Sequence, residues 1–386
     1  MKELYLDDMV GLMRPGIKIP LSAIKLMRQV RALKKKNYPV PLMAVWILTY
    51  KCNFRCSHCY IEGSPESQSE ELPTRDAKQL ISILADAGVR GLTFSGGEPL
   101  VREDFLELVG HVKASGMEPI IMTNGALLNT KILEDLKTLG IRRLGISLDG
   151  ATEETYNRIR QTDGYDLIMS NLAEAQRLGL SILLCMTIQR DNFREVNNFI
   201  DLGLKFGVAR VVLRDIIPYG RAMKNNDISP VEREELLKVY YKRSKDLRDV
   251  MEVTICDAAP WLRIMLELSK EEGAILDHMR IRLMGKFMRG CPAAALFCGV
   301  SPEGNLLPCP FLLISVGNIL KEGFTELWHN SEVMKNIRNQ DIKGKCKICE
   351  YMEVCGGCRA RAYGYVGDYL AADPGCNYAP KKGKEK

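Results

Sequence analysis

The sequence contains no uncharged stretch of about 18 residues, which is the length that a membrane-spanning helix requires. Its first residues, MKELYLDDMVGLMRPG, carry Asp7 and Asp8 where a signal peptide has its apolar core, and no small-residue cleavage site follows. No repeat of solenoid length runs through the 386 residues. These absences predict a cytoplasmic globular protein and exclude a repeat architecture.

Most of the chain also lacks a net positive charge. The formal net charge is +6, but residues 18–36 hold seven basic and no acidic residues, and residues 381–386 hold four lysines against one glutamate. The remainder is net acidic, so we expect no nucleic-acid partner. Residues 21–36 have the spacing of a basic amphipathic helix. It could pack on its own domain, dock on a membrane surface or partner protein, or bind an anionic substrate.

Cysteine, in contrast, is abundant and unevenly placed. Eight of the 13 cysteines lie after residue 290, and an odd number cannot pair completely in disulfides. In the reducing cytoplasm, clustered cysteines are more often metal ligands than disulfide partners. The sequence therefore predicts metal centres.

Six apolar, β-rich runs alternate with segments of helical periodicity between residues 44 and 250. The runs cover residues 43–50, 91–96, 119–124, 142–150, 181–188 and 209–216. Each is nearly continuous in hydrophobicity, as strands buried on both faces are. The alternation predicts parallel βα units, arranged as a doubly wound sheet or as a full or partial barrel. In both cases chemistry is expected beyond the carboxyl ends of the strands.

We expect five segments along the chain. They are a basic amphipathic N-terminal segment (1–42), the βα domain (43–250), a helical linker (251–290), a cysteine-rich domain (291–380) and a lysine-rich tail (381–386).

Two motifs follow the first two predicted strands. Cys52, Cys56 and Cys59 have a C-x3-C-x2-C spacing, which can hold three irons of a cubane cluster and leave the fourth iron open to a ligand. A structural zinc site completed by His58 is the alternative. After the second strand comes Ser95-Gly-Gly-Glu-Pro99, in which glycines let the backbone approach a ligand and Glu98 can pair with a cation.

At these residues the sequence resembles the radical S-adenosylmethionine (SAM) superfamily. The resemblance implies an α/β fold, a partial (β/α)6 TIM-like barrel. It implies that Cys52, Cys56 and Cys59 ligate a 4Fe–4S cluster that chelates SAM. The segment Gly96, Gly97, Glu98 and Pro99 would hold the amino group of SAM. One electron from the cluster would then cleave SAM, giving methionine and a 5′-deoxyadenosyl radical that abstracts a hydrogen atom from the substrate.

Further residues match the superfamily along the same domain. Ser147, in Ser147-Leu-Asp-Gly150, would lie near the ribose and carboxylate of SAM, and Arg160 would neutralise that carboxylate unless it is simply a helix-surface arginine. Arg160 lies in a stretch that departs from the HDxxRG-type pattern. Asn124 and the segment 189–192 are either SAM contacts or ordinary turn residues. Residues 218–221 resemble a PxGR segment, either a turn or part of the substrate pocket.

The C-terminal cysteines resemble the SPASM extension of radical SAM enzymes, with C-x2-C in place of its usual last C-x3-C. The resemblance implies two auxiliary 4Fe–4S clusters. The first would use Cys291, Cys298, Cys309 and Cys358, and the second Cys346, Cys349, Cys355 and Cys376. Two four-cysteine zinc sites are the alternative. Cys185, inside a predicted strand, is expected to pack as a small apolar residue, whereas the role of Cys256 stays open.

The resemblance implies a cytoplasmic, oxygen-sensitive oxidoreductase that removes a hydrogen atom from an unactivated carbon. The sequence looks most like the branch that includes haem d1 and alternative haem biosynthesis enzymes, which act on carboxylate side chains of a tetrapyrrole. A peptide- or protein-modifying maturase is the first alternative, a lipid substrate the next, and a non-catalytic zinc module the alternative of another class. Ferredoxin or flavodoxin is the electron donor that the family implies.

Overall fold

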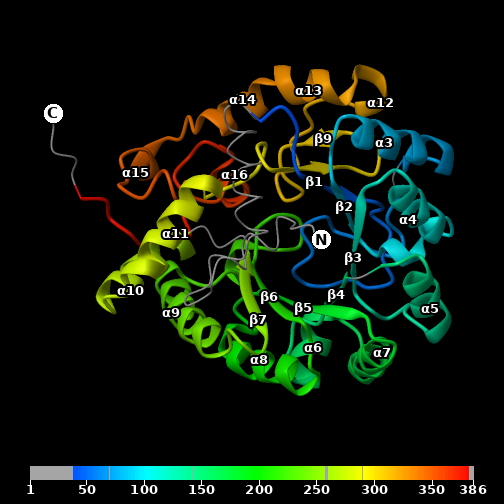
Figure 1. The fold of residues 1–386 in the computed structure, drawn as a ribbon, viewed down its shortest axis with the longest axis horizontal. Coiled ribbons are helices and arrows are strands. Elements are labelled where there is room, and N and C mark those ends of the chain that lie inside the picture. The colour runs from blue at the N-terminus through cyan, green and yellow to red at the C-terminus, as the bar shows by residue number, and fades with distance from the viewer. Residues whose placement is uncertain (1–37, 69, 142, 257–259, 289, 382–386) are drawn as a thin grey trace.

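The computed structural model describes residues 38–381 except 69, 142, 257–259 and 289, so the predicted basic helix of residues 21–36 lies outside the described residues. A nine-stranded sheet forms the centre of the molecule, with the strand order β7-β6-β5-β4-β3-β2-β1-β8-β9 (Figure 1). The strands are β1 (Met43–Ile47), β2 (Gly91–Ser95), β3 (Glu118–Thr123), β4 (Arg143–Ser147), β5 (Ser181–Ile188), β6 (Arg210–Asp215), β7 (Glu252–Cys256), β8 (Phe297–Val300) and β9 (Leu306–Leu307).

Helices cover the outer side of the strands in a ring, with each crossover helix beside the strands that it connects (Figure 1). They are α3 (Thr74–Asp86), α4 (Phe105–Ala114), α5 (Thr130–Thr138), α6 (Glu153–Arg160), α7 (Tyr165–Arg177), α8 (Val196–Lys205) and α9 (Pro230–Asp246). Short 3-10 helices span Pro99–Val101, Phe193–Glu195 and Lys224–Asn226. The parallel βα units predicted from the alternation, and the partial barrel that the resemblance implied, are confirmed, because β1 to β6 pair in parallel in chain order.

The two faces of the strands differ as the alternation of side chains requires. Met43 and Val45 of β1 line the interior of the barrel, whereas Ala44 and Trp46 are fully buried against the outer layer. A helix such as α3 covers that outer face because Ala77, Leu80, Ile81 and Leu84 recur at helical spacing and are fully buried. The interior is therefore left for a cavity while the core lies between strands and helices.

The segment 251–290 differs from the purely helical linker that the sequence predicts. It begins with β7, which pairs in parallel with β6 and extends the barrel sheet by one strand. Helices α10 (Trp261–Glu271) and α11 (Ile275–Met288) follow, as expected. The five residues Glu252–Cys256 are too short a run to stand out beside the long helical pattern that comes after them.

The cysteine-rich region adds β8 and β9 to the other edge of the sheet, where β8 pairs in parallel with β1. Its helices are short: α12 (Ile319–Glu322), α13 (Phe324–Asn330), α14 (Glu332–Asn339), α15 (Gly344–Lys347) and α16 (Arg359–Val366). Among the described residues, no helix is both long and apolar enough to cross a membrane.

Candidate active site

The loop after β1 brings the first three cysteines together at the carboxyl end of the barrel. Cys52 and Cys56 are buried and Cys59 is half-buried. Burial raises the pKa of Cys52 to about 12, and the nearby thiols of Cys56 and Cys59 contribute to that rise. Backbone N–H groups point at two of the sulfurs, with Phe54 N 3.4 Å from Cys52 Sγ and Gly63 N 3.3 Å from Cys59 Sγ. Such donors favour thiolates, so the loop suits three cluster ligands.

The two glycines after β2 hold this loop by a close backbone approach. Gly97 N donates to Thr49 O at 2.8 Å, and Glu98 N donates to Lys51 O at 3.0 Å. A Cβ on Gly97 would lie 2.2 Å from Lys51 O, so no side chain fits there. Gly96 and Gly97 also line the cavity described below. The glycines therefore position the cysteine loop itself, in addition to lining the space beside it.

Glu98 is fully buried beside that space, and its predicted pairing with a cation stays a prediction. Its buried carboxylate accepts hydrogen bonds from Leu100 N (3.1 Å), Thr123 Oγ1 (2.8 Å) and Asn124 N (2.7 Å). Burial raises the pKa of Glu98 to about 6, although these donors oppose the rise. Neither Glu98 nor Pro99 lines the cavity. Glu98 instead joins the end of β2 to the end of β3.

Asn124 and Ser147 both reach the cavity from the ends of β3 and β4. Asn124 Nδ2 donates to Asn53 Oδ1 at 2.7 Å and lies 3.9 Å from Cys52 Sγ. In the segment 189–192, Gln189 and Asn192 are buried and do not line the cavity. Asn192 Nδ2 donates to the carbonyls of Asp149 and Thr187, both at 2.8 Å. The turn interpretation therefore describes residues 189–192.

Arg160 is a buried ion-pair partner and not a helix-surface residue. Its Nη2 lies 2.7 Å from Asp149 Oδ2, and its Nη1 lies 3.7 Å from Cys56 Sγ. Asp149 Oδ2 also lies 3.1 Å from His58 Nε2, so His58 faces this carboxylate. Burial alone would raise the pKa of Asp149, but Arg160 and His58 outweigh it and lower that pKa to about 2. The pair places one fixed positive charge beside the cysteine loop.

The departure from the HDxxRG-type pattern after Arg160 has a local explanation. Gln161 ends α6 in the left-handed conformation, with φ of 54°, and its N–H bonds to Asn157 O. Glycine favours this conformation, but a polar residue can adopt it at modest cost. The helix therefore ends in the required way, and Arg160 keeps its place in the last turn.

Residues 218–221, which follow β6, contact the cysteine loop and hold it by hydrogen bonds. Arg221 donates from Nε to Cys56 O at 2.9 Å and from Nη2 to Gly63 O at 2.7 Å. Gly220 has φ of +59°, and a Cβ there would lie 2.6 Å from Tyr60 O. Arg221 also lines the cavity. The segment is therefore a turn that forms part of the cavity wall.

Four of the C-terminal cysteines gather into one group. The charges of Cys346 and Cys376 both contribute to the raised pKa values of Cys349 and Cys355, for which burial is the main cause. Asp373 N lies 3.4 Å from Cys346 Sγ. The structure thus brings together the set predicted for the second auxiliary cluster.

The set predicted for the first auxiliary cluster does not come together completely. Cys291, Cys309 and Cys358 line the cavity, but Cys298 does not. In β8, Cys298 is in register with Ala44 and is fully buried in the apolar core on the outer face. Burial alone raises its pKa, without a contribution from another thiol. The geometry therefore disfavours Cys298 as the fourth ligand, because strand alternation turns it away from the other three.

Cys185 packs against Leu183 and Val212 in a small apolar cluster inside the barrel, next to Cys256. Cys256 also lines the cavity at the end of β7. Within the described part of the chain, no three side chains of His, Cys, Asp or Glu converge on a point where one metal ion would bind.

One cavity connects the two cysteine regions. Thiols from the loop after β1 and from the C-terminal region line the same space. Its walls are largely apolar, with Met122, Trp261, Phe297 and Phe311 among them, and Arg160, Arg214, Arg221 and Arg359 add positive charge. Tyr60 also lines it, with its ring 4.8 Å from that of Phe311. Sequence reasoning missed Asp149, Tyr60 and Arg214 as site residues, although Asp149 stands within a motif that it used and Tyr60 directly follows another.

The comparisons with known proteins agree with this geometry. The family model of the radical SAM superfamily matches residues 46–203, and that of the SPASM iron–sulfur cluster-binding domain matches residues 291–359. The AdoMet-dependent heme synthase of Methanosarcina barkeri is 33% identical over 344 residues, which cover 89% of this chain and 98% of the relative. The Fe-coproporphyrin III synthase of the same organism is 30% identical over 91% of each chain.

Solved structures share the fold at lower identity. Streptococcus suis SuiB bound to S-adenosylmethionine has a TM-score of 0.72 and 16% identity, covering 92% of this chain and 82% of SuiB. Native anSMEcpe with bound AdoMet has a TM-score of 0.67 and 18% identity, covering 87% of this chain and 94% of the other. With SAM and 4Fe–4S clusters as its cofactors, the chain belongs to the radical SAM superfamily and is an iron–sulfur enzyme with a C-terminal SPASM domain.

Proposed function

We propose that this enzyme acts on a tetrapyrrole and oxidises or decarboxylates its carboxylate side chains. The observation that carries the proposal is the single cavity that thiols of both cysteine regions line. A substrate held there lies between the site of radical formation and an electron acceptor. Four relatives that match at 30% identity or more over most of the chain are named for heme or Fe-coproporphyrin III synthesis, which supports a tetrapyrrole.

In this proposal Cys52, Cys56 and Cys59 hold the SAM-binding cluster. Gly96, Gly97, Asn124, Ser147 and Arg160, all of which line the cavity, would contact SAM. Glu98 and Pro99 would act indirectly by fixing the strand ends. The second auxiliary set would be Cys346, Cys349, Cys355 and Cys376, and the first would be Cys291, Cys309 and Cys358. Bound at its cluster, SAM supplies the radical that removes a hydrogen atom from the substrate.

The cavity has both apolar and positively charged walls, and a tetrapyrrole with propionate groups needs both. Apolar side chains can contact the ring, and arginines can bind carboxylates through paired N–H donors. Arg214 is half-buried at the end of β6. Burial raises the pKa of Tyr60, and Arg214 opposes that rise, so the two side chains are neighbours. We therefore assign Arg214 to a substrate carboxylate.

The proposed net conversion is balanced. A propionate that loses one hydrogen atom, one electron and carbon dioxide becomes a vinyl group. The hydrogen atom would leave in 5′-deoxyadenosine, and an auxiliary cluster would accept the electron. What this chain contributes is a fixed position for the carboxylate and a cavity with apolar walls that limits access of water.

The test is turnover under anaerobic conditions with dithionite, SAM and Fe-coproporphyrin III. We expect 5′-deoxyadenosine in proportion to tetrapyrrole products that have lost carbon dioxide, measured by mass spectrometry. R214Q should raise KM for the tetrapyrrole about tenfold while SAM cleavage without substrate is unchanged, whereas R194Q, at an exposed arginine, should change neither. An unchanged tetrapyrrole beside active SAM cleavage would reject the proposal.

A peptide-modifying maturase is the second candidate. The mycofactocin maturase MftC of Mycobacterium tuberculosis is 29% identical over 352 residues, which cover 89% of this chain and 84% of the relative. A peptide encoded beside the gene should then be modified in the same assay while the tetrapyrrole is not.

The remaining expectations stay predictions: reduction by ferredoxin or flavodoxin, a cytoplasmic location, and docking through residues 21–36. The domain boundaries at residues 43, 250 and 291 are likewise proposals. Limited proteolysis should cut near them if they separate folded units.

A further inference from the structure

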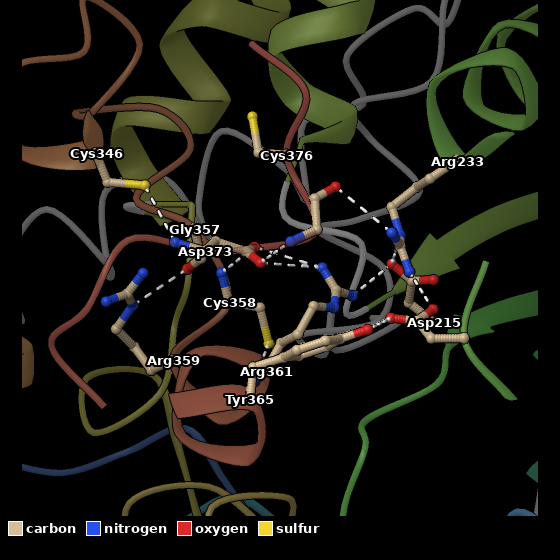
Figure 2. A network of polar contacts seen from close by, with 12 residues as sticks. Asp215, Arg233, Cys346, Gly357, Cys358, Arg359, Arg361, Tyr365, Asp373 and Cys376 are labelled. Carbon is tan, nitrogen blue, oxygen red and sulfur yellow. Dashed lines mark hydrogen bonds and ion pairs between the residues drawn. The ribbon is translucent and has the colours of Figure 1, made fainter. Parts of the chain in front are cut away.

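A buried network of charges contacts one cysteine of each auxiliary set and reaches the end of β6 (Figure 2). It contains the arginines Arg233 and Arg361 and the carboxylates Asp215, Asp227 and Asp373, all buried. The residues come from β6, the loop before α9, α9, α16 and the segment after α16. Regions more than 140 residues apart in the sequence therefore meet in one polar cluster.

Asp373 contacts both cysteine sets. Its carboxylate accepts the N–H of Cys358, in the first set, at 2.8 Å, and its own N–H lies 3.4 Å from Cys346 Sγ, in the second set. The carboxylate also accepts Gly375 N at 2.9 Å. Figure 2 shows Asp373 between these two cysteines. One residue therefore acts on a ligand of each proposed cluster.

Arg361 holds Asp373 and connects it to the barrel. Its Nη1 lies 3.4 Å from Asp373 Oδ2, and its Nη2 donates to Asp215 at the end of β6. The backbone N–H of Arg361 also lies 3.4 Å from Cys358 Sγ. The ion pair with Arg361 and the N–H groups of Cys358 and Gly375 favour the charged form of the Asp373 carboxylate.

The barrel side of the network fixes the other end. Arg233 on α9 lies 2.6 Å from Asp215 Oδ2 through Nε and also bonds to Asp227. Tyr365 OH, from α16, donates to Asp227 Oδ2 at 2.9 Å. Arg233 Nη1 further lies 3.5 Å from Gly375 O, two residues beyond Asp373.

Stability alone does not account for so much buried charge. Apolar residues of similar volume often stabilise a core as well as a buried ion pair does, because the ions lose their hydration. The contacts to cysteine sulfur and cysteine N–H point to a role at the clusters. Hydrogen bonds to cluster sulfurs and nearby charges set reduction potentials.

We propose that Asp373, held by Arg361, is a positioning residue that sets the reduction potentials of both auxiliary clusters together. Its negative charge opposes the addition of an electron to either cluster. The positive charge of Arg361 acts in the opposite direction, most strongly at the first set. This role is independent of which substrate the enzyme uses.

The test is a redox titration of the full-length, cluster-loaded enzyme followed by electron paramagnetic resonance. D373N removes the charge and keeps the shape. It should raise the ratio of reduced to oxidised cluster at a given potential on the order of tenfold, or about 59 mV, for both auxiliary signals. R361Q should lower that ratio, chiefly at the first set. The radical SAM cluster provides an internal reference that should not move.

D368N is the matched control, since Asp368 lies five residues away, is partly exposed and pairs with Lys343 on the surface. It should leave all three signals unchanged. Iron content and the melting temperature are measured for each variant, and R361K tests geometry with the charge kept. Movement of one auxiliary signal alone in D373N would overturn the proposal. The proposal would also be overturned if D373N lost iron while R361Q and R361K left the reduction potentials unchanged. The network would then serve only the folding of the region.

Discussion

The two cysteine regions are held in place by different means. Backbone contacts from neighbouring strand ends hold the loop of Cys52, Cys56 and Cys59, such as Gly97 N to Thr49 O and Arg221 N to Cys59 O. The C-terminal set lies among short helices and turns, where the buried charges around Asp373 take the place of a sheet. The barrel therefore preorganises the first site, whereas buried ion pairs hold the second site, which we expect to depend more on its metal.

Replacing the loop cysteines should have the largest effect on activity. It should remove the cluster of the first region and leave those of the second in place. C52A, C56A and C59A together should abolish SAM cleavage, because no thiolate remains to hold the SAM-binding cluster. Iron should fall from about twelve to about eight per chain, since the auxiliary sets are untouched. The measurements are 5′-deoxyadenosine formation and iron content. C185A, at a packed cysteine inside the barrel, serves as the control. Residual cleavage in the triple variant would show that the ligands are assigned wrongly.

Removing all clusters should affect the two regions unequally. Metal binding and folding are coupled where little regular structure exists without the metal. In the apoprotein, amides of residues 341–376 should exchange with solvent much faster than in the loaded enzyme, while those of β2 to β5 stay protected. Hydrogen exchange with mass spectrometry measures this. Equal loss of protection in both regions would contradict the contrast between them.

The first region also contains a buried carboxylate, Asp149, which pairs with Arg160 and His58. Backbone hydrogen bonds cannot take over this role. D149N leaves the buried guanidinium of Arg160 without its carboxylate, which is expected to destabilise the enzyme by about 3–5 kcal/mol. SAM cleavage should fall as well, because Arg160 lies beside Cys56. Urea unfolding of the loaded enzyme gives the free energy. D191N, an exposed change nearby, should have almost no effect. If D149N and D191N unfolded alike, the ion pairs would contribute nothing to this site.

Glu98 offers the smallest effect, and one that depends on pH. Because burial raises its pKa from 4.5 to about 6, the folded state keeps a proton that the unfolded chain releases. The contribution of Glu98 to stability is therefore greatest below about pH 4.5 and falls by about 2 kcal/mol as pH rises through 6.

E98Q cannot titrate, so it isolates this dependence. The free energy of unfolding of the wild type relative to E98Q should fall by about 2 kcal/mol between about pH 4 and about pH 7. E103Q, at an exposed glutamate, should show no comparable change. A constant difference between wild type and E98Q over this range would mean that Glu98 is not buried as described.

The sequence predicted the barrel and the cysteine motifs because both leave local signals. Apolar runs of strand length marked β1 to β6, and the cysteine spacing together with the Gly-Gly-Glu-Pro motif after the second strand marked the loop of Cys52. The partners of Glu98 were not predictable, since two of them, Thr123 and Asn124, lie at the end of the next strand of the sheet. Cysteine spacing likewise cannot reveal that Cys298 lies in register with Ala44.

The network around Asp373 left no signal in the sequence at all. Its members are common charged residues without a motif, and Asp215 meets Arg361 only after the barrel and the C-terminal region have packed together. Strand β7 was missed for a different reason, because five residues next to a long helical segment give too weak a pattern.

The pairing of β8 with β1 has a consequence for the synthesis of the chain. Strand β1 remains an edge strand until residues 297–300 have left the ribosome, and Trp46 then donates its indole N–H to Ser301 O across 255 residues. During that interval the loop of Cys52, Cys56 and Cys59 is already translated while one side of its barrel is still open. A nascent chain that stalls before residue 297 would therefore expose an unpaired, apolar strand edge and depend on chaperones to avoid aggregation.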